Sequence, residues 1–343
     1  MDIGRALGIT WEWMVCMLFR PFRLKIWLGL GFVVLMTGAF SVVSPELFTR
    51  VENSRFFVGR VTPEVFSDWL TKFWPLAIPS APALILLFLL VQWISSVFNF
   101  VFIDDISRKS AAIREPFRRL SRLGTSFFLW QVVFGLIVVV VVGLPTLIGI
   151  AVMAGFLIES GTAAVGWQIP LVILVLYVVC LILVAVLIQS FTIDFALVIM
   201  YARNIQIIDA WKTLLPILKT NLVQVVYYTL FRILFALAMC VGMLADLIAW
   251  RVFAIPISLS SAVVFSAWLA DGLRGYCLAI LLAIMLCLPL WFCCAWLGCV
   301  LMLPVTVFIR SLPMVMLGQT DPLLVTIPLN SRHAQSPGNS PLG

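Results

Sequence analysis

Long runs of uncharged, mostly apolar residues divide the sequence into segments. A helix needs about 20 apolar residues to cross the hydrocarbon of a bilayer. Six runs are long enough, and we expect one transmembrane helix from each; they cover residues 26–45, 77–101, 123–158, 160–193, 222–249 and 275–309. A seventh segment, 252–270, is uncharged but contains Pro256 and four serines, so it is either a weak span or an interfacial or re-entrant segment.

Three segments place apolar side chains on one helical face, opposite polar or basic residues; they are 7–18, 106–120 and 207–218. This pattern is typical of a helix that lies in the membrane interface. Each segment also has a proline within it or close by among basic residues, and these are Pro21, Pro116 and Pro216. Because proline lacks a backbone donor, we expect it to break the helix and turn the chain into the bilayer, or to kink the helix at Pro116.

The same order recurs three times: an apolar stripe on one helical face, a proline among basic residues, and then transmembrane spans. This recurrence predicts three repeats, over 1–102, 103–193 and 194–310. The alternative is that any multi-pass protein has basic loops at hairpin spacing, and the stripes and prolines do not share one register. The predicted fold class is all-α, a polytopic membrane helix bundle with about six transmembrane helices in three hairpins, each preceded by an interfacial amphipathic helix. We expect one integral membrane domain over 1–329 and a disordered polar tail over 330–343.

Composition and charge place the chain in a membrane and predict its topology. Apolar residues make up 63% of the sequence and charged residues only 11%, which nearly rules out a soluble globular protein. Cytoplasmic loops are enriched in Lys and Arg, so we place the basic segments 20–25, 103–126 and 203–219 inside and the balanced loop 46–72 outside. Six spans then put both termini in the cytoplasm, whereas seven would put the C-terminal segment, which begins at Arg310, outside.

The net charge of +7 suggests lipid and not nucleic acid as the partner. The basic residues recur in short segments between apolar runs and form no single tract, so we expect no nucleic-acid binding. We expect instead that the basic segments contact membrane lipids, anionic on the cytoplasmic face.

Enzyme signatures and metal-ligand spacings are absent from the sequence. There is no HExxH, GxSxG, GxxxxGK[ST] or GxGxxG motif, and the single histidine, His333, lies in the polar tail. The eight cysteines lie in apolar runs without CxxC spacing, so we interpret them as packing residues and expect no metal or cofactor. The pair Asp104–Asp105 could bind a divalent cation with a phosphate head group, but consecutive helical residues point about 100° apart. The alternative is a charged pair that marks the cytoplasmic end of the second span.

Two charges lie inside the fifth run, and intramembrane charges are functional candidates. Arg232 and Asp246 are 14 residues apart, about 21 Å along a helix, so they cannot pair directly. Arg232 could reach the cytoplasmic interface beside Tyr227 and Tyr228, or pair with Asp194 at the inner end of the fourth span. These residues are either structural anchors or part of a polar transport pathway.

Prolines inside the long runs predict kinks at Pro145, Pro289 and Pro304. Each proline frees a backbone carbonyl of the preceding turn from its usual partner. Neighbouring helices must supply donors for these carbonyls, because lipid offers none.

Three stretches carry a family resemblance: FRPFRLKIWLGLGF at 19–32, IDDISRKSAAIREPFRRL at 103–120 and DFALVIMYARNIQIIDAW at 194–211. They resemble a family of uncharacterised prokaryotic multi-pass proteins, which is distantly similar to the membrane domain joined to some glycerophosphodiester phosphodiesterases. The resemblance implies a helical bundle in the prokaryotic inner membrane and no catalytic residues. No stretch of the chain is soluble and long enough to hold the phosphodiesterase domain itself.

Three functions fit these observations. The first is a non-enzymatic integral membrane protein, a scaffold or accessory factor for lipid or envelope processes. The second is a transporter or channel that uses Arg232 and Asp246. The third is a membrane enzyme acting on lipid head groups through Asp104 and Asp105.

Overall fold

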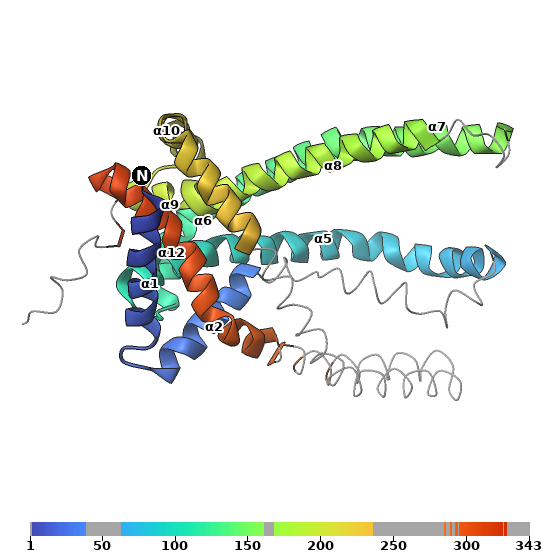
Figure 1. The fold of residues 1–343 in the computed structure, drawn as a ribbon. Coiled ribbons are helices and arrows are strands. Elements are labelled where there is room, and N and C mark those ends of the chain that lie inside the picture. The colour runs from blue at the N-terminus through green and yellow to red at the C-terminus, as the bar shows by residue number, and fades with distance from the viewer. Residues whose placement is uncertain are drawn as a thin grey trace, which may run out of the picture. The chain divides into compact units, whose positions relative to one another are not determined.

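The protein is seen in a computed structural model that describes residues 2–38, 63–160, 168–235 and 295–324, and positions 285, 289, 292, 293, 326 and 327. Every regular element within these ranges is a helix, which confirms the all-α class (Figure 1). The segment 252–270, Asp246 and the tail 330–343 lie outside the described residues.

Three described helices are long and apolar enough to cross a membrane, namely Ala81–Arg108, Arg114–Val152 and Pro170–Arg203. Two bent helix pairs bring the number to five if each pair is one span. The pairs are Ile207–Thr220 with Leu222–Phe235, bent by 102°, and Ala295–Leu301 with Leu303–Thr320, bent by 60°. The predicted six spans include segments beyond the described residues, so the number six stays a prediction.

The chain forms two compact units, which we describe separately. Unit 1 holds the described residues of Met1–Leu35 and Pro216–Thr320, and unit 2 those of Met36–Leu215 and Asp321–Pro328. The elements of unit 1 include α1 (Ile3–Leu18), most of α2 (Leu24–Gly38) and α12 (Leu303–Thr320). Those of unit 2 are α5 (Pro63–Arg108), α6 (Arg114–Val138), η1 (Val139–Gly143), α7 (Leu144–Ser160), α8 (Gln168–Phe191), η3 (Thr192–Ala196), α9 (Leu197–Arg203), the first part of α10 (Ile207–Thr220), and η4 (Pro322–Leu324). A single domain over 1–329 stays a prediction.

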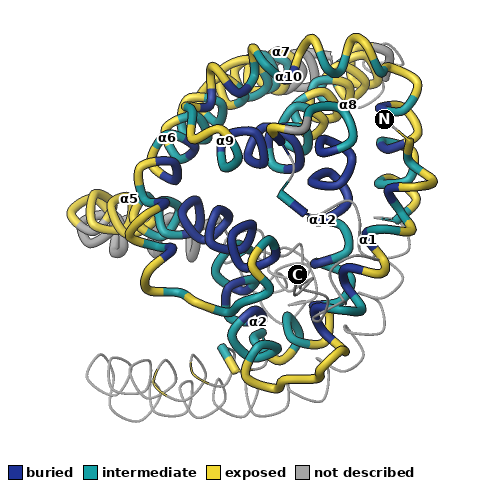
Figure 2. Tube along the Cα trace, turned by 90° about the vertical axis from the view of Figure 1, so that its left-hand side faces the viewer, coloured by how far each residue is buried: buried dark blue, intermediate teal, exposed yellow. Residues whose placement is uncertain are grey.

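The core of unit 2 lies where the C-terminal part of α5 packs against α6 and α9 (Figure 2). Large side chains are fully buried there, among them Phe100, Phe102, Phe127, Phe195 and Ile199. Gly124 permits the close approach of α6 to α5, because a Cβ at this position would lie 2.8 Å from the Cα atom of Val97. This packing fixes the end of α5 against the start of α6, where the polar cluster described below is found.

Away from this core, the residues of α5, α7 and α8 whose burial the structure describes are mostly exposed and apolar (Figure 2). The most apolar windows of Arg114–Val152 and Pro170–Arg203 have no buried residue. Exposed side chains include Leu86, Leu147, Val152, Ile173 and Leu176. Soluble proteins rarely expose continuous apolar surface of this kind, so these helices suit lipid as their solvent.

Pro145 shows how a proline is accommodated in such an exposed helix. The five-residue π-helix η1 immediately precedes α7, and Pro145 is the second residue of α7. Proline cannot donate to the Val141 carbonyl, and the Tyr177 hydroxyl on α8 donates to that carbonyl at 3.3 Å instead. The Thr146 hydroxyl donates to the next carbonyl, that of Val142, at 2.5 Å. The prediction that a neighbouring helix satisfies a carbonyl freed by Pro145 is confirmed.

In unit 1, α1 packs against α12. The Asp2 carboxylate caps α1 by accepting from the backbone N–H groups of Gly4 and Arg5, at 3.0 and 3.3 Å. The backbone N–H of Asp2 donates to Gln319 Oε1 at 2.7 Å, and the Trp11 ring meets the Phe308 ring edge to face. The start of α1 therefore lies beside the end of α12, so the two helices are antiparallel.

The structure confirms two of the three predicted amphipathic helices and corrects the third. Residues 7–18 lie in α1 and residues 207–218 in α10, so both form helices as predicted. One continuous helix over 106–120 is wrong, because α5 ends at Arg108 and α6 begins at Arg114. The connection between them is shaped by polar contacts that an apolar stripe does not encode, as the next section describes.

The prolines also act differently from one another. Pro116 does not kink a helix; it lies in the first turn of α6, where its missing N–H costs little. Pro216 does not end its helix, since α10 continues through it to Thr220 and the 102° bend follows. Pro304 lies at the start of α12, directly after the 60° bend, as predicted for a kink.

Candidate functional site

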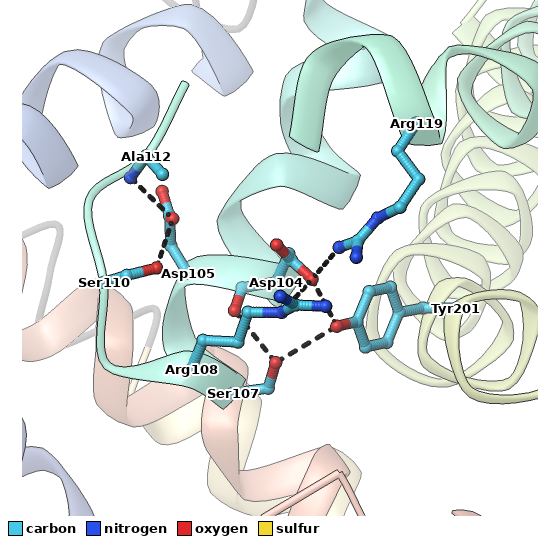
Figure 3. Close-up of polar contacts among 8 residues, drawn as sticks. All are labelled: Asp104, Asp105, Ser107, Arg108, Ser110, Ala112, Arg119 and Tyr201. Atoms are coloured by element: carbon cyan, nitrogen blue, oxygen red, sulfur yellow. Dashed lines mark hydrogen bonds and ion pairs between the residues drawn. The ribbon is translucent and has the colours of Figure 1, made fainter. Parts of the chain in front are cut away.

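A buried carboxylate at the C-terminal end of α5 forms the centre of the most developed polar cluster in the described residues (Figure 3). Asp104 is 1% exposed, and its Oδ1 atom accepts from three donors. Arg108 Nε lies at 3.0 Å, Arg119 Nη2 at 2.5 Å and the Tyr201 hydroxyl at 2.5 Å. Because these donors belong to α5, α6 and α9, one oxygen atom joins three helices.

Ser107 completes the cluster. Its hydroxyl donates to the Asp104 carbonyl at 2.9 Å and lies 3.2 Å from the Tyr201 hydroxyl. The side chains of Arg108 and Arg119 are about half exposed, so water still solvates both guanidinium groups. The cluster therefore pairs a buried acceptor with partly hydrated donors, an arrangement that avoids burying two whole charges.

Asp105 is fully buried but bonds to a different part of the chain. Its Oδ1 atom accepts from the Ser110 hydroxyl at 3.2 Å and from the Ala112 backbone N–H at 3.1 Å. Lys109, which lies between Asp105 and Ser110 in the sequence, has a left-handed backbone with φ of 52°. Asp105 thus shapes the connection between α5 and α6, and its Oδ2 atom has no hydrogen-bond partner among the described residues.

The two aspartates therefore do not converge on one point. Asp104 faces α6 and α9, while Asp105 faces the connection that leads to α6 (Figure 3). This divergence is the one expected for adjacent residues on a helix. The described part of the chain holds no group of three or more His, Cys, Asp or Glu side chains that could bind a metal ion.

Asp194 and Arg232 are the other two candidate residues that the structure describes. Asp194, in η3 of unit 2, is 2% exposed. Arg232 belongs to unit 1 and donates to the Tyr228 hydroxyl at 3.3 Å. The pairing of Arg232 with Asp194 stays a prediction, and Asp246 lies outside the described residues.

Sequence reasoning missed most partners of Asp104. The pairing of Arg108 with Asp104 could be predicted from the sequence, because residues four apart are neighbours on a helix. Tyr201 is 97 residues away and Arg119 lies beyond a break in the helix, so neither carries a local signal.

The fold and the site define the class of protein: an all-helical protein with several helices long and apolar enough to span a membrane, joined at one end by a buried carboxylate. Residues 2–327 match a family described as a family of unknown function (DUF7544), and the chain belongs to this family. Comparisons with curated proteins and with solved structures found no match.

Proposed function

We propose that the protein is a non-enzymatic integral protein of the prokaryotic cytoplasmic membrane and acts as a scaffold or accessory factor. The observation that carries this proposal is the occupation of Asp104 Oδ1 by three protein donors from three helices. A carboxylate used in this way holds helices together and is a poor acid or base for a substrate. The distant similarity to the membrane domain joined to some glycerophosphodiester phosphodiesterases stays a prediction, because the matching family is one of unknown function.

The exposed apolar helices support this location, and the basic segments support its orientation. Cytoplasmic placement of 103–126 puts the Asp104 cluster on the side where anionic lipid and cytoplasmic partners are found. Membrane lipids are therefore the first partners of the proposed scaffold.

A transporter or channel is the second candidate. It is favoured by the bent pairs, because broken helices in transporters often line the substrate path. Arg232 lies in the second helix of the pair bent by 102° and would be the residue to test.

One reconstitution separates these functions. The full chain is placed in liposomes, lipid turnover is followed by mass spectrometry, and flux is followed with an ion-sensitive dye. We expect neither activity from the scaffold. Lipid turnover that is lost in Asp105→Asn would overturn the proposal in favour of an enzyme, and flux that is lost in Arg232→Leu would overturn it in favour of a transporter.

A second experiment tests the scaffold directly. The tagged chain is purified from its native membrane in mild detergent, and the proteins that accompany it are quantified. We expect at least one protein in a fixed ratio to the chain. The absence of any protein at a fixed ratio, in several mild detergents, contradicts a scaffold function.

A further inference from the structure

A pocket of about 530 Å³ lies at the start of α6, beside the Asp104 cluster. Its lining consists of three arginines and one glutamate, Arg114, Arg118, Arg119 and Glu115. Arg118 and Arg119 follow Arg114 by four and five residues, so the three arginines lie on neighbouring faces of one helix. The lining carries more positive than negative charge and is of a size that small-molecule ligands occupy.

Arg119 of this pocket is held in place by the buried Asp104, and the backbone that leads to Arg114 is fixed by the buried Asp105. Arg119 extends from α6 to Asp104, where one of its N–H groups is bonded at 2.5 Å (Figure 3). A guanidinium has five N–H donors, so Arg119 retains others for a ligand. Asp105 fixes the chain at Ala112, two residues before Arg114. The position of Arg119 and the backbone that leads to Arg114 are therefore fixed before a ligand binds.

We propose that this pocket binds a phosphate monoester group through Arg114, Arg118 and Arg119. Guanidinium groups bind phosphate oxygens by paired, charge-assisted hydrogen bonds, and three of them match the three free oxygens of a monoester. Glu115 weakens binding, because its charge repels the phosphate. The same chemistry is offered by the head group of phosphatidic acid and by a soluble phosphate ester.

This inference deepens the proposed function, since it names a ligand for the same cytoplasmic segment, and its lipid form rests on the proposed membrane location. The test uses the purified full chain in detergent micelles, titrated with phosphatidic acid or phosphatidylcholine and followed by native mass spectrometry. A parallel titration with inorganic phosphate measures competition. We expect phosphatidic acid to bind about tenfold or more tightly than phosphatidylcholine.

Two variants of opposite sign keep the test independent of folding. The double variant Arg114→Ala, Arg118→Ala is expected to lower affinity for phosphatidic acid by about tenfold or more. Glu115→Gln is expected to raise it, which no loss of structure would do. Arg122 is exposed on the same helix but does not line the pocket, so Arg122→Ala is the matched control with a change below about twofold.

The outcomes decide between a built site and general attraction of charge. Equal binding of the two lipids, or an equal loss in Arg122→Ala and the double variant, would overturn the pocket. Competition by inorganic phosphate that disappears in the double variant supports the pocket. Phosphatidic acid that resists millimolar inorganic phosphate identifies the lipid head group as the ligand, whereas displacement by it at micromolar concentration identifies a soluble phosphate ester. Lipid turnover in the same sample would overturn the non-enzymatic function and leave the pocket standing, so the two failures are distinguishable.

Discussion

Asp104 and Asp105 are adjacent and equally buried, yet they bond to different parts of unit 2. Asp104 accepts from three donors on three helices, and the two bonds from Arg108 and Arg119 are charge-assisted. Asp105 accepts from two donors in the connection that follows α5, and its Oδ2 atom has no partner among the described residues. The charge is therefore needed at Asp104, whereas at Asp105 only the acceptor oxygen is needed.

This difference predicts unequal effects of the same substitution. Asp104→Asn is expected to lower the free energy of unfolding by about 2–3 kcal/mol, because the amide cannot replace a carboxylate that joins three helices. Asp105→Asn keeps one acceptor oxygen and removes a buried charge, so we expect a change below about 1 kcal/mol, or stabilisation. Denaturation of both variants in one detergent measures the difference. Equal losses would mean that the Asp104 cluster does not anchor the helices.

Among the elements, the α7–α8 pair shows how an exposed helix tolerates proline. The π-helix η1 and the Tyr177 hydroxyl together compensate for the donor that Pro145 lacks. Hydrogen bonds between membrane helices stabilise them by about 0.6 kcal/mol on average, and by more where the alternative is an unpaired carbonyl. The bond from Tyr177 to Val141 is therefore coupled to the proline.

A double-mutant cycle tests this coupling. Tyr177→Phe is expected to lower the free energy of unfolding by about 1 kcal/mol in the natural sequence. In a Pro145→Ala background the alanine N–H can bond to the Val141 carbonyl, so the same change is expected to cost much less. Tyr227→Phe serves as control, because Tyr227 is exposed and its hydroxyl has no partner among the described residues. Equal losses in both backgrounds would contradict the coupling.

The elements also show which features the sequence predicts. The predicted span 77–101 falls within α5. Such a span can be predicted because hydropathy depends only on residues that are neighbours in the sequence. The break at 109–113 was not predictable in this way, since it depends on Asp105 bonding to the Ala112 N–H in competition with the helix. The site was predictable only in part, because Tyr201 meets Asp104 through the packing of α5 against α9.

At the scale of the whole molecule, the predicted orientation in the membrane rests on the distribution of charged residues, because the helices alone do not predict one. Long exposed apolar helices identify lipid as the solvent, but they are compatible with either direction of insertion. The basic residues at 20–25 and at 103–126 predict one direction, because cytoplasmic loops are enriched in Lys and Arg. Two spans separate these segments in the predicted topology, so both lie on one side.

Reporter fusions test the predicted membrane topology. Fluorescent protein fused to either terminus is expected to fluoresce, because it folds in the cytoplasm. The predicted outer loop 46–72 is shortened at its end by α5, which begins at Pro63, so alkaline phosphatase is inserted before Pro63 and is expected to be active, because it folds outside. If 252–270 is a seventh span, the C-terminal fusion loses fluorescence while the N-terminal fusion keeps it. A phosphatase fusion at the same C-terminal position is the reciprocal control, since it gains activity only in the seven-span arrangement. Activity of phosphatase placed within 103–126 would reverse the orientation and remove the Asp104 cluster and its arginine pocket from the cytoplasm.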